Sequence, residues 1–197
     1  MTGANGEGAY RAENARAAKD FYVVLSGCSG GGKSSLLQEL SRRGYRIFEE
    51  PGRQIIKEQN AIGGDAVPGK NIRAFAEICV SRSINRMIEA AGTDDFMFFD
   101  RGLVDVVSWY EYAKQAVPAH FESAAQQFRY RTKVFLVPPW PEIFENDAER
   151  KHSLAEALAQ YEALPKTYAR LGYTPVMVPK TSISERADFV LQELDAL

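Results

Sequence analysis

The sequence contains few of the residues and patterns that mark several specialised protein classes. Its 197 residues include only two cysteines, Cys28 and Cys79, and no C-x-x-C pair, which excludes a disulfide scaffold and a cysteine-rich zinc site. No apolar run approaches the roughly 18 residues of a membrane span, and residues 1–20 lack the apolar stretch of a signal peptide. We therefore expect a protein of a reducing compartment, placed in the cytoplasm, that has no membrane partner.

An excess of positive charge is also missing. The 24 Lys and Arg residues face 26 Asp and Glu residues, so the formal net charge of −2 supplies no global field that would draw the chain onto nucleic acid. Hydrophobic residues make up 45% of the chain, which is typical of a folded globular protein. The length fits one domain, which we place at residues 21–197, after a leader, residues 1–20, that is a mobile tail or a loosely docked short helix.

Short apolar segments alternate with helical segments along this domain. Strands joined by connections of more than about a dozen residues form right-handed crossovers, so the pattern predicts an α/β fold with a parallel, doubly wound sheet of five strands. Ligands bind at the carboxyl ends of the strands in such sheets. The predicted strands are residues 21–26, 45–49, 96–99, 133–137 and 175–178, and the predicted helices are residues 33–42, 53–60, 71–91, 103–116, 119–130, 141–171 (interrupted near Pro165) and 184–194.

Residues 27–34, GCSGGGKS, match the phosphate-binding pattern G-x-x-x-x-G-K-[ST] between a predicted strand and a predicted helix. Glycines permit the backbone to approach phosphate oxygens closely, and the helix N-terminus adds partial positive charge. Lys33 would bridge the β- and γ-phosphates of ATP, and the Ser34 hydroxyl would bind Mg²⁺. The alternative is a flexible glycine turn beside a lysine in solvent. The residues expected to bind the nucleotide are Gly27, Ser29, Gly30, Gly31, Gly32, Lys33, Ser34 and Ser35.

Asp100 and Arg101 follow the apolar segment at residues 96–99. Asp100 is the carboxylate that we expect to face the metal, and Arg101 presents a fork of donors for phosphate oxygens. The glutamate that hydrolytic ATPases usually place directly after this aspartate is absent, and no N-K-x-D guanine signature occurs, which weakens an ATPase or a Ras-like switch. The alternative makes Asp100 the N-cap of the following helix and Arg101 its ion-pair partner.

The segment Glu49-Glu50-Pro51-Gly52-Arg53 follows the second predicted strand. A carboxylate there would accept the proton of an attacking hydroxyl, and Arg53 would hold an anionic part of the acceptor or lie near the transferred phosphoryl group. We favour Glu50 over Glu49 because the residue before a proline is held extended. The alternative is a solvated pair of glutamates before a proline turn.

Residues 140–152 follow the fourth predicted strand, where small-molecule kinases carry a lid that closes on the phosphates. Arg150 would add positive charge where the transferred oxygens need it. The alternative is a charged helical face on which Asp147, Glu149 and Arg150 pair at helix spacing. The expected catalytic residues are thus Lys33, Glu50, Asp100, Arg101 and Arg150, with Glu50, Arg53 and Arg101 facing the acceptor and Ser34 and Asp100 binding the metal.

Taken in order, these motifs resemble a small "AAA domain" P-loop family. That family includes nicotinamide-riboside kinase domains and is similar more distantly to nucleoside and nucleoside monophosphate kinases. The resemblance implies a P-loop NTPase fold with strand order 2-3-1-4-5, a helical lid, a base at Glu50, a phosphate-binding Arg101 and a lid residue Arg150. The motifs that carry it are residues 27–34, 50–53, 100–102, 129–130, 147–150, 171–173 and 185–186.

Two classes of function follow from this resemblance and the motifs. The first is an ATP-dependent phosphotransferase that uses Mg²⁺ and moves the γ-phosphoryl group to a nucleoside, a nucleotide or a nucleoside-like small molecule. The second is a nucleotide-binding regulatory module, for ATP or GTP, or an ATPase with no small-molecule acceptor. We expect a monomer or homodimer whose partners are ATP and the acceptor, without nucleic acid.

Overall fold

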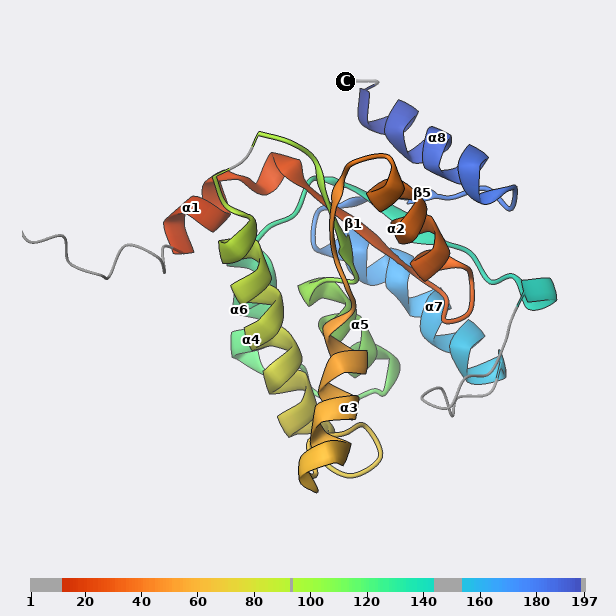
Figure 1. The fold of residues 1–197 in the computed structure, drawn as a ribbon. Helices are drawn as coiled ribbons and strands as arrows, with labels where there is room; N and C mark the ends of the chain where they lie inside the picture. Colours follow the sequence, from red (N-terminus) through yellow and green to blue (C-terminus); the bar gives the residue numbers. More distant parts are fainter. Residues whose placement is uncertain (1–11, 93, 144–153, 196–197) are drawn as a thin grey trace, which may run out of the picture.

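The computed structural model describes residues 12–92, 94–143 and 154–195. Its centre is one parallel sheet whose strand order, β2-β3-β1-β4-β5, confirms the predicted five-stranded α/β fold (Figure 1). The order means that the chain crosses over β1, so the carboxyl ends of β1, β2 and β3 lie side by side at one edge. The strands are β1 Tyr22–Gly27, β2 Arg46–Phe48, β3 Met97–Asp100, β4 Lys133–Val137 and β5 Thr174–Met177.

Helices cover both faces of the sheet (Figure 1). Helices α2 and α8 pack together on one face, and α1, α4, α5, α6 and α7 contribute buried residues to the core on the other face. The helices are α1 Ala12–Ala17, α2 Lys33–Arg42, α3 Pro51–Ile62, α4 Ile72–Ala90, α5 Leu103–Tyr112, α6 Ala119–Gln127, α7 Leu154–Arg170 and α8 Ile183–Asp195, with short 3₁₀ helices at Lys19–Phe21 and Pro141–Ile143. None of the helices in these described ranges is long and apolar enough to cross a membrane.

The central strand β1 explains the two cores. All of its side chains are buried, and they alternate between the faces because successive residues of a strand point in opposite directions. Tyr22 and Val24 join the core under α4, α5 and α7, whereas Val23 and Leu25 join the core under α2 and α8. A strand buried on both faces reads as a continuous apolar run, which is why this segment was predictable.

The leader is helical where the structure describes it. Ala15 in α1 is fully buried in the core that also contains residues of α4 and α6, and the Arg16 guanidinium donates to the Gln127 side chain at 2.8 Å. The sequence left open a mobile tail or a docked short helix for the leader, and the described part of it, α1, is a docked helix. The packed region therefore begins before residue 21.

The predicted interruption of the helix at Pro165 is wrong. Helix α7 runs through this proline, although proline removes one backbone donor. Leu164 and Tyr168, on either side of it, are buried in the same core, and the Thr167 hydroxyl donates to the Ala163 carbonyl at 3.2 Å. The packing of both halves of α7 against one core outweighs the tendency of proline to interrupt a helix, as tertiary contacts often outweigh local propensity.

Two other helices are shorter than predicted. Helix α5 ends at Tyr112 and is followed by Lys114 in the left-handed conformation, with φ 53°. Helix α6 ends at Gln127 rather than at residue 130. Most of the predicted lid, residues 144–152, lies outside the described residues. The predicted helix at residues 141–171 is therefore described only as a 3₁₀ turn at its start and as α7 from Leu154.

Candidate active site

The loop between β1 and α2 has a backbone that only glycine suits. Gly27, Gly30 and Gly32 have φ of 123°, 80° and 81°, a region that other L-residues rarely adopt. A Cβ atom at Gly27 would lie 2.2 Å from the Val137 carbonyl oxygen, so the loop is pressed against the end of β4. In the described residues, the N–H groups of Gly30 and Gly32 donate to no backbone carbonyl. The loop therefore has amide donors available for an anion.

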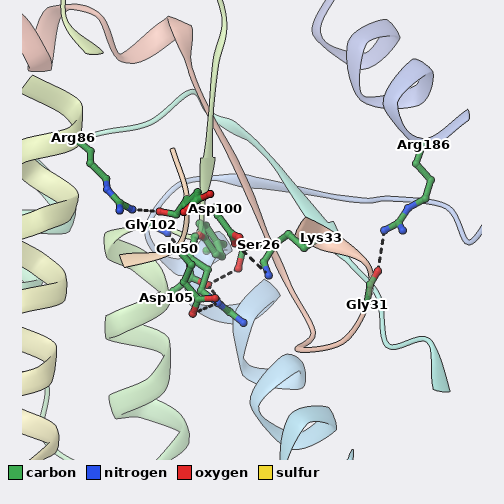
Figure 2. Close-up of polar contacts among 12 residues, drawn as sticks. Ser26, Gly31, Lys33, Glu50, Arg86, Asp100, Gly102, Asp105 and Arg186 are labelled. Atoms are coloured by element: carbon green, nitrogen blue, oxygen red, sulfur yellow. Dashed lines mark hydrogen bonds and ion pairs between the residues drawn. The ribbon is translucent and has the colours of Figure 1, made fainter. Parts of the chain in front are cut away.

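Lys33, the first residue of α2, is not the solvent lysine of the alternative interpretation. Its side chain is only 4% exposed, and its Nζ atom lies 3.2 Å from Oδ1 of Asp100, at the end of β3 (Figure 2). Ser34 and Ser35 follow it in the first turn of the helix, and Ser34 is exposed. Because β1 and β3 are neighbours in the sheet, their carboxyl ends bring together Lys33 and Asp100, which are 67 residues apart in the sequence.

Asp100, the last residue of β3, is a buried carboxylate and not a helix cap. Helix α5 begins at Leu103 with Gly102 as its N-cap, so the alternative role of Asp100 as the cap is wrong. Burial raises the pKa of Asp100, while the nearby Lys33 ammonium works in the opposite direction. Its Oδ1 atom forms the ion pair with Lys33 and accepts no other hydrogen bond from the described groups, and a carboxylate is a ligand of the kind that Mg²⁺ prefers.

No cluster of three or more His, Cys, Asp or Glu ligands exists within the described ranges. A metal at this edge of the sheet would therefore take most of its ligands from phosphate and water, as Mg²⁺ commonly does in phosphate-transfer sites. Ser34 and Asp100 provide a hydroxyl and a carboxylate, which are donor groups of the right type for such an ion.

Arg101 lies between the carboxylates of Glu50 and Asp105. Its Nε is 3.2 Å from Oε1 of Glu50, and its Nη1 is 3.1 Å from Oδ1 of Asp105. Burial disfavours the charged guanidinium, but Glu50 and Asp105 outweigh this effect and raise the pKa of Arg101. Its backbone has φ 64°, a strained conformation for a non-glycine residue that is common at functional sites.

Asp105 is a residue that the sequence interpretation missed. Its carboxylate accepts hydrogen bonds from the Ser26 hydroxyl, from the Gly102 N–H at 2.8 Å and from the Tyr168 hydroxyl at 2.7 Å, in addition to the contact with Arg101. It therefore joins the end of β1, the start of α5 and helix α7 around the arginine. The only sequence signal was an acidic residue at the third position of a helix, where carboxylates accept from exposed backbone amides.

The structure separates the two glutamates after β2. Glu50 lines a cavity beside the loop and pairs with Arg101, whereas Glu49 is exposed and its carboxylate accepts from the Gln54 amide at 3.3 Å. Arg53, in the first turn of α3, lines the same cavity as Glu50. The alternative of a solvated pair of glutamates therefore does not describe Glu50.

This cavity has a volume of about 390 Å³. It lies between residues 27–34, which we call the phosphate loop, and helices α3, α4, α5 and α7. Gly27 and Ser29 of the loop form one wall. Aromatic side chains and a few polar groups, which the sequence interpretation did not assign, form the others: Phe75, Trp109, Tyr112, Tyr161, Ser83, Ser108 and Gln160. A cavity of this size with aromatic walls and few polar groups has the usual properties of a small-molecule site.

Arg150, the predicted lid residue, lies outside the described residues. Trp140, at the start of the predicted lid, is described, and its ring lies against the guanidinium of Arg186 in α8, 5.7 Å from Cζ to the ring centroid. Of the predicted catalytic residues, Lys33, Glu50, Asp100 and Arg101 are thus gathered at one edge of the sheet, and their roles remain predictions.

Comparisons with known proteins agree with this architecture. A family model described as an AAA domain matches residues 22–186. No curated protein matches the chain in sequence. A structure of deoxyadenosine kinase from M. mycoides, with dCMP and dCDP bound, is similar with a TM-score of 0.67 and 14% identity, over 89% of this chain and 100% of that one.

Thymidylate kinases are also similar in structure. The enzyme from Ehrlichia chaffeensis has a TM-score of 0.57 and 11% identity over 89% of this chain and 98% of its own. The enzyme from Candida albicans has a TM-score of 0.57 and 13% identity over 90% of this chain and 92% of its own. At these identities the likeness shows a shared fold, the P-loop kinase fold.

Proposed function

Since the chain belongs to the AAA domain family and has the fold of P-loop kinases, we propose that it is a small-molecule kinase. It transfers the γ-phosphoryl group of ATP to a nucleoside, a nucleotide or a nucleoside-like acceptor. Residues 21–197 with the docked helix α1 act as one domain, as a monomer or homodimer in the cytoplasm.

The observation that carries this proposal is the shared wall between the phosphate loop and the cavity. Gly27 and Ser29 of the loop line the same cavity as Glu50 and Arg101. A molecule in this cavity would lie next to a nucleotide whose phosphates are bound by the loop amides. An ATPase without an acceptor has no need of a cavity at this position, whereas a transferase must hold a second substrate in line with the phosphoryl group.

The donor side of the site uses the phosphate loop. The loop amides and Lys33 would bind the phosphates, and Ser34 and Asp100 would hold Mg²⁺, which neutralises the charge of the phosphates when it is bound. Lys33 already carries a buried positive charge, held by Asp100 at 3.2 Å. Preorganised charges in a site that excludes water stabilise the transition state strongly because they need no reorganisation.

On the acceptor side, Glu50 is the residue that we propose accepts the proton. Its carboxylate lines the cavity and is oriented by the Arg101 guanidinium. Arg101 and Arg53 would neutralise the transferred phosphoryl group or an anionic part of the acceptor. Phe75, Trp109 and Tyr161 offer flat apolar surfaces against which a planar ring would stack. These features support a nucleoside-like acceptor, in keeping with neighbours named deoxyadenosine kinase and thymidylate kinase.

The test replaces the proposed base. Glu50→Gln keeps the shape of the side chain and removes its basicity, so we expect ATP to bind normally and transfer to fall by about 10²- to 10⁴-fold in kcat. The adjacent Glu49 is exposed and outside the cavity, so Glu49→Gln is the matched control and should keep full activity. Steady-state kinetics with an acceptor identified by ATP consumption measures both variants.

A Glu50→Gln protein with the wild-type kcat would remove Glu50 as the base. If no acceptor in a broad panel of nucleosides, nucleotides and related metabolites consumes ATP, while a protein partner binds only the nucleotide-loaded form, the chain is instead a nucleotide-gated regulatory module.

A further inference from the structure

Arg186, in the first turn of α8, is the largest side chain that is almost completely buried. It is 1% exposed, and its Nη2 atom donates to the Gly31 carbonyl of the phosphate loop at 3.1 Å, across 155 residues of sequence (Figure 2). Burial lowers the pKa of this guanidinium. Within the described ranges, no carboxylate forms an ion pair with Arg186, and its buried Nε has no hydrogen-bond partner.

Burying an arginine to join a helix to a loop has a high cost in desolvation free energy. A buried cation loses its hydration, and well-packed apolar side chains often replace buried charges without loss of stability. The neighbours of Arg186 in the same helix, Ala187 and Val190, belong to the apolar core on this face of the sheet. Apart from the contact of its guanidinium with the Trp140 ring, nothing in the packing of α8 calls for a charged residue at this position.

The contact with Gly31 has a stereochemical consequence for the loop. The described chain has no cis peptide bonds, and in a planar trans peptide the C=O and N–H bonds point in opposite directions. When Arg186 holds the Gly31 carbonyl toward α8, the N–H of Gly32 is therefore directed away from α8. Gly32 is the N-cap of α2, and its N–H donates to no backbone carbonyl in the described chain.

Gly31 also packs closely against the end of β4. A Cβ atom there would lie 2.7 Å from the Pro138 carbonyl oxygen and 2.9 Å from Cγ1 of Val137, so the loop is packed tightly against the end of β4. The peptide between Gly31 and Gly32 is thus held both by this packing and by the guanidinium of Arg186. This arrangement leaves it little freedom to rotate.

We propose that Arg186 is a positioning residue for nucleotide binding. It fixes the Gly31–Gly32 peptide so that the Gly32 N–H faces the phosphates of the bound nucleotide. The C-terminal helix α8, which contributes nothing to the cavity wall, thereby determines the affinity for the donor nucleotide. This inference rests on the proposed function, because it takes the loop as the nucleotide-binding site.

The test compares Arg186→Met and Arg186→Lys with the wild-type protein. Methionine fills similar space without donors, and lysine keeps the charge and one donor group. We expect Arg186→Met to raise the Kd of a nonhydrolysable ATP analogue with Mg²⁺ about tenfold, since misplacing one charge-assisted contact in a preorganised site has effects of this order. Arg186→Lys should restore part of the affinity. The melting temperature without nucleotide should stay the same or rise.

Arg43→Met is the matched control. Arg43, the C-cap residue of α2, donates to Asp188 and Ser184 of α8, so this change removes a different polar contact of α8 without touching the loop. It should leave the Kd unchanged. A merely structural role for Arg186 predicts the reverse, a lower melting temperature with wild-type affinity, and that result would overturn the inference.

Lys33→Ala separates failure of this inference from failure of the proposed function. If Lys33→Ala loses nucleotide binding while Arg186→Met keeps it, the loop binds nucleotide and only the role of Arg186 is wrong. If both variants bind the analogue like the wild-type protein, the loop is not the nucleotide site and the proposed function fails as well.

Discussion

At the scale of single residues, the most consequential contact is the buried pair of Lys33 and Asp100. Both side chains are less than a tenth exposed, and their atoms are 3.2 Å apart. Lys33 therefore has two roles: it is the expected phosphate ligand, and its charge offsets that of the buried Asp100 carboxylate. Removing one partner of such a pair leaves an uncompensated charge, which costs more than the pair contributes.

Lys33→Ala should therefore lower stability as well as nucleotide binding. We expect a loss of about 1–3 kcal/mol in the free energy of unfolding, because Asp100 is left buried without its cation. The double variant Lys33→Ala/Asp100→Asn should recover most of the stability but none of the nucleotide binding. Urea unfolding and analogue titration measure the two effects separately. A double variant as unstable as the single one would show that the ion pair does not explain the loss.

The stability deficit of Lys33→Ala should also depend on pH. Burial raises the pKa of Asp100, so the native protein holds this proton more tightly than the unfolded chain, and the Lys33 ammonium opposes the shift. Without Lys33 the pKa rises further. The deficit should be smallest at acid pH, below the ordinary aspartate range, and should grow as the pH rises through the raised pKa of Asp100. Urea unfolding of both proteins across this range tests the sign.

At the scale of secondary-structure elements, the short helix α1 shows how far the packed domain extends toward the N-terminus. Ala15 is fully buried in the core beside α4 and α6, whereas Ala17, in the same helix, is exposed. A helix of this length has little stability of its own, so its structure depends on this packing.

Ala15→Asp should separate α1 from the core. A carboxylate at this buried position has no partner, and we expect a loss of about 1–3 kcal/mol in the free energy of unfolding. Ala17→Asp introduces the same charge on the exposed side and should change stability by less than about 0.5 kcal/mol. Thermal unfolding of both variants makes the comparison. Equal melting temperatures for the two would mean that α1 contributes nothing to the folded domain.

At the scale of the whole molecule, the site is assembled from segments at both ends of the chain. The phosphate loop follows β1, Glu50 follows β2, Asp100 and Arg101 follow β3, and Arg186 comes from the last helix. A ligand that contacts these segments binds only the folded protein and must raise its stability.

Thermal shift should therefore report both substrates. A nonhydrolysable ATP analogue with Mg²⁺ at about 100 times its Kd should add about 2.7 kcal/mol to the free energy of unfolding. A true acceptor, sought among nucleosides, nucleoside monophosphates and nicotinamide riboside, should give a further rise in the presence of the analogue. Nucleotide stabilisation with no additional effect from any acceptor would support the regulatory alternative.

The sequence by itself determined the features that depend on contiguous residues or on the alternation of strands and helices. The phosphate loop is eight consecutive residues whose glycines set its backbone, so residues 27–34 were sufficient to predict it. The alternation of apolar strands and helices predicted the parallel sheet, and the strand order that the family resemblance implied brings residues 50 and 100–101 near the loop.

Only the tertiary structure decided the contacts between distant side chains. Asp105 accepts from Ser26 across 79 residues, and Arg186 donates to Gly31 across 155 residues. Helix α7 continues through Pro165 because the core holds both of its halves. In each case the local sequence is compatible with several structures. Packing decides among them, and a buried polar group must in addition find its partner wherever the fold provides one.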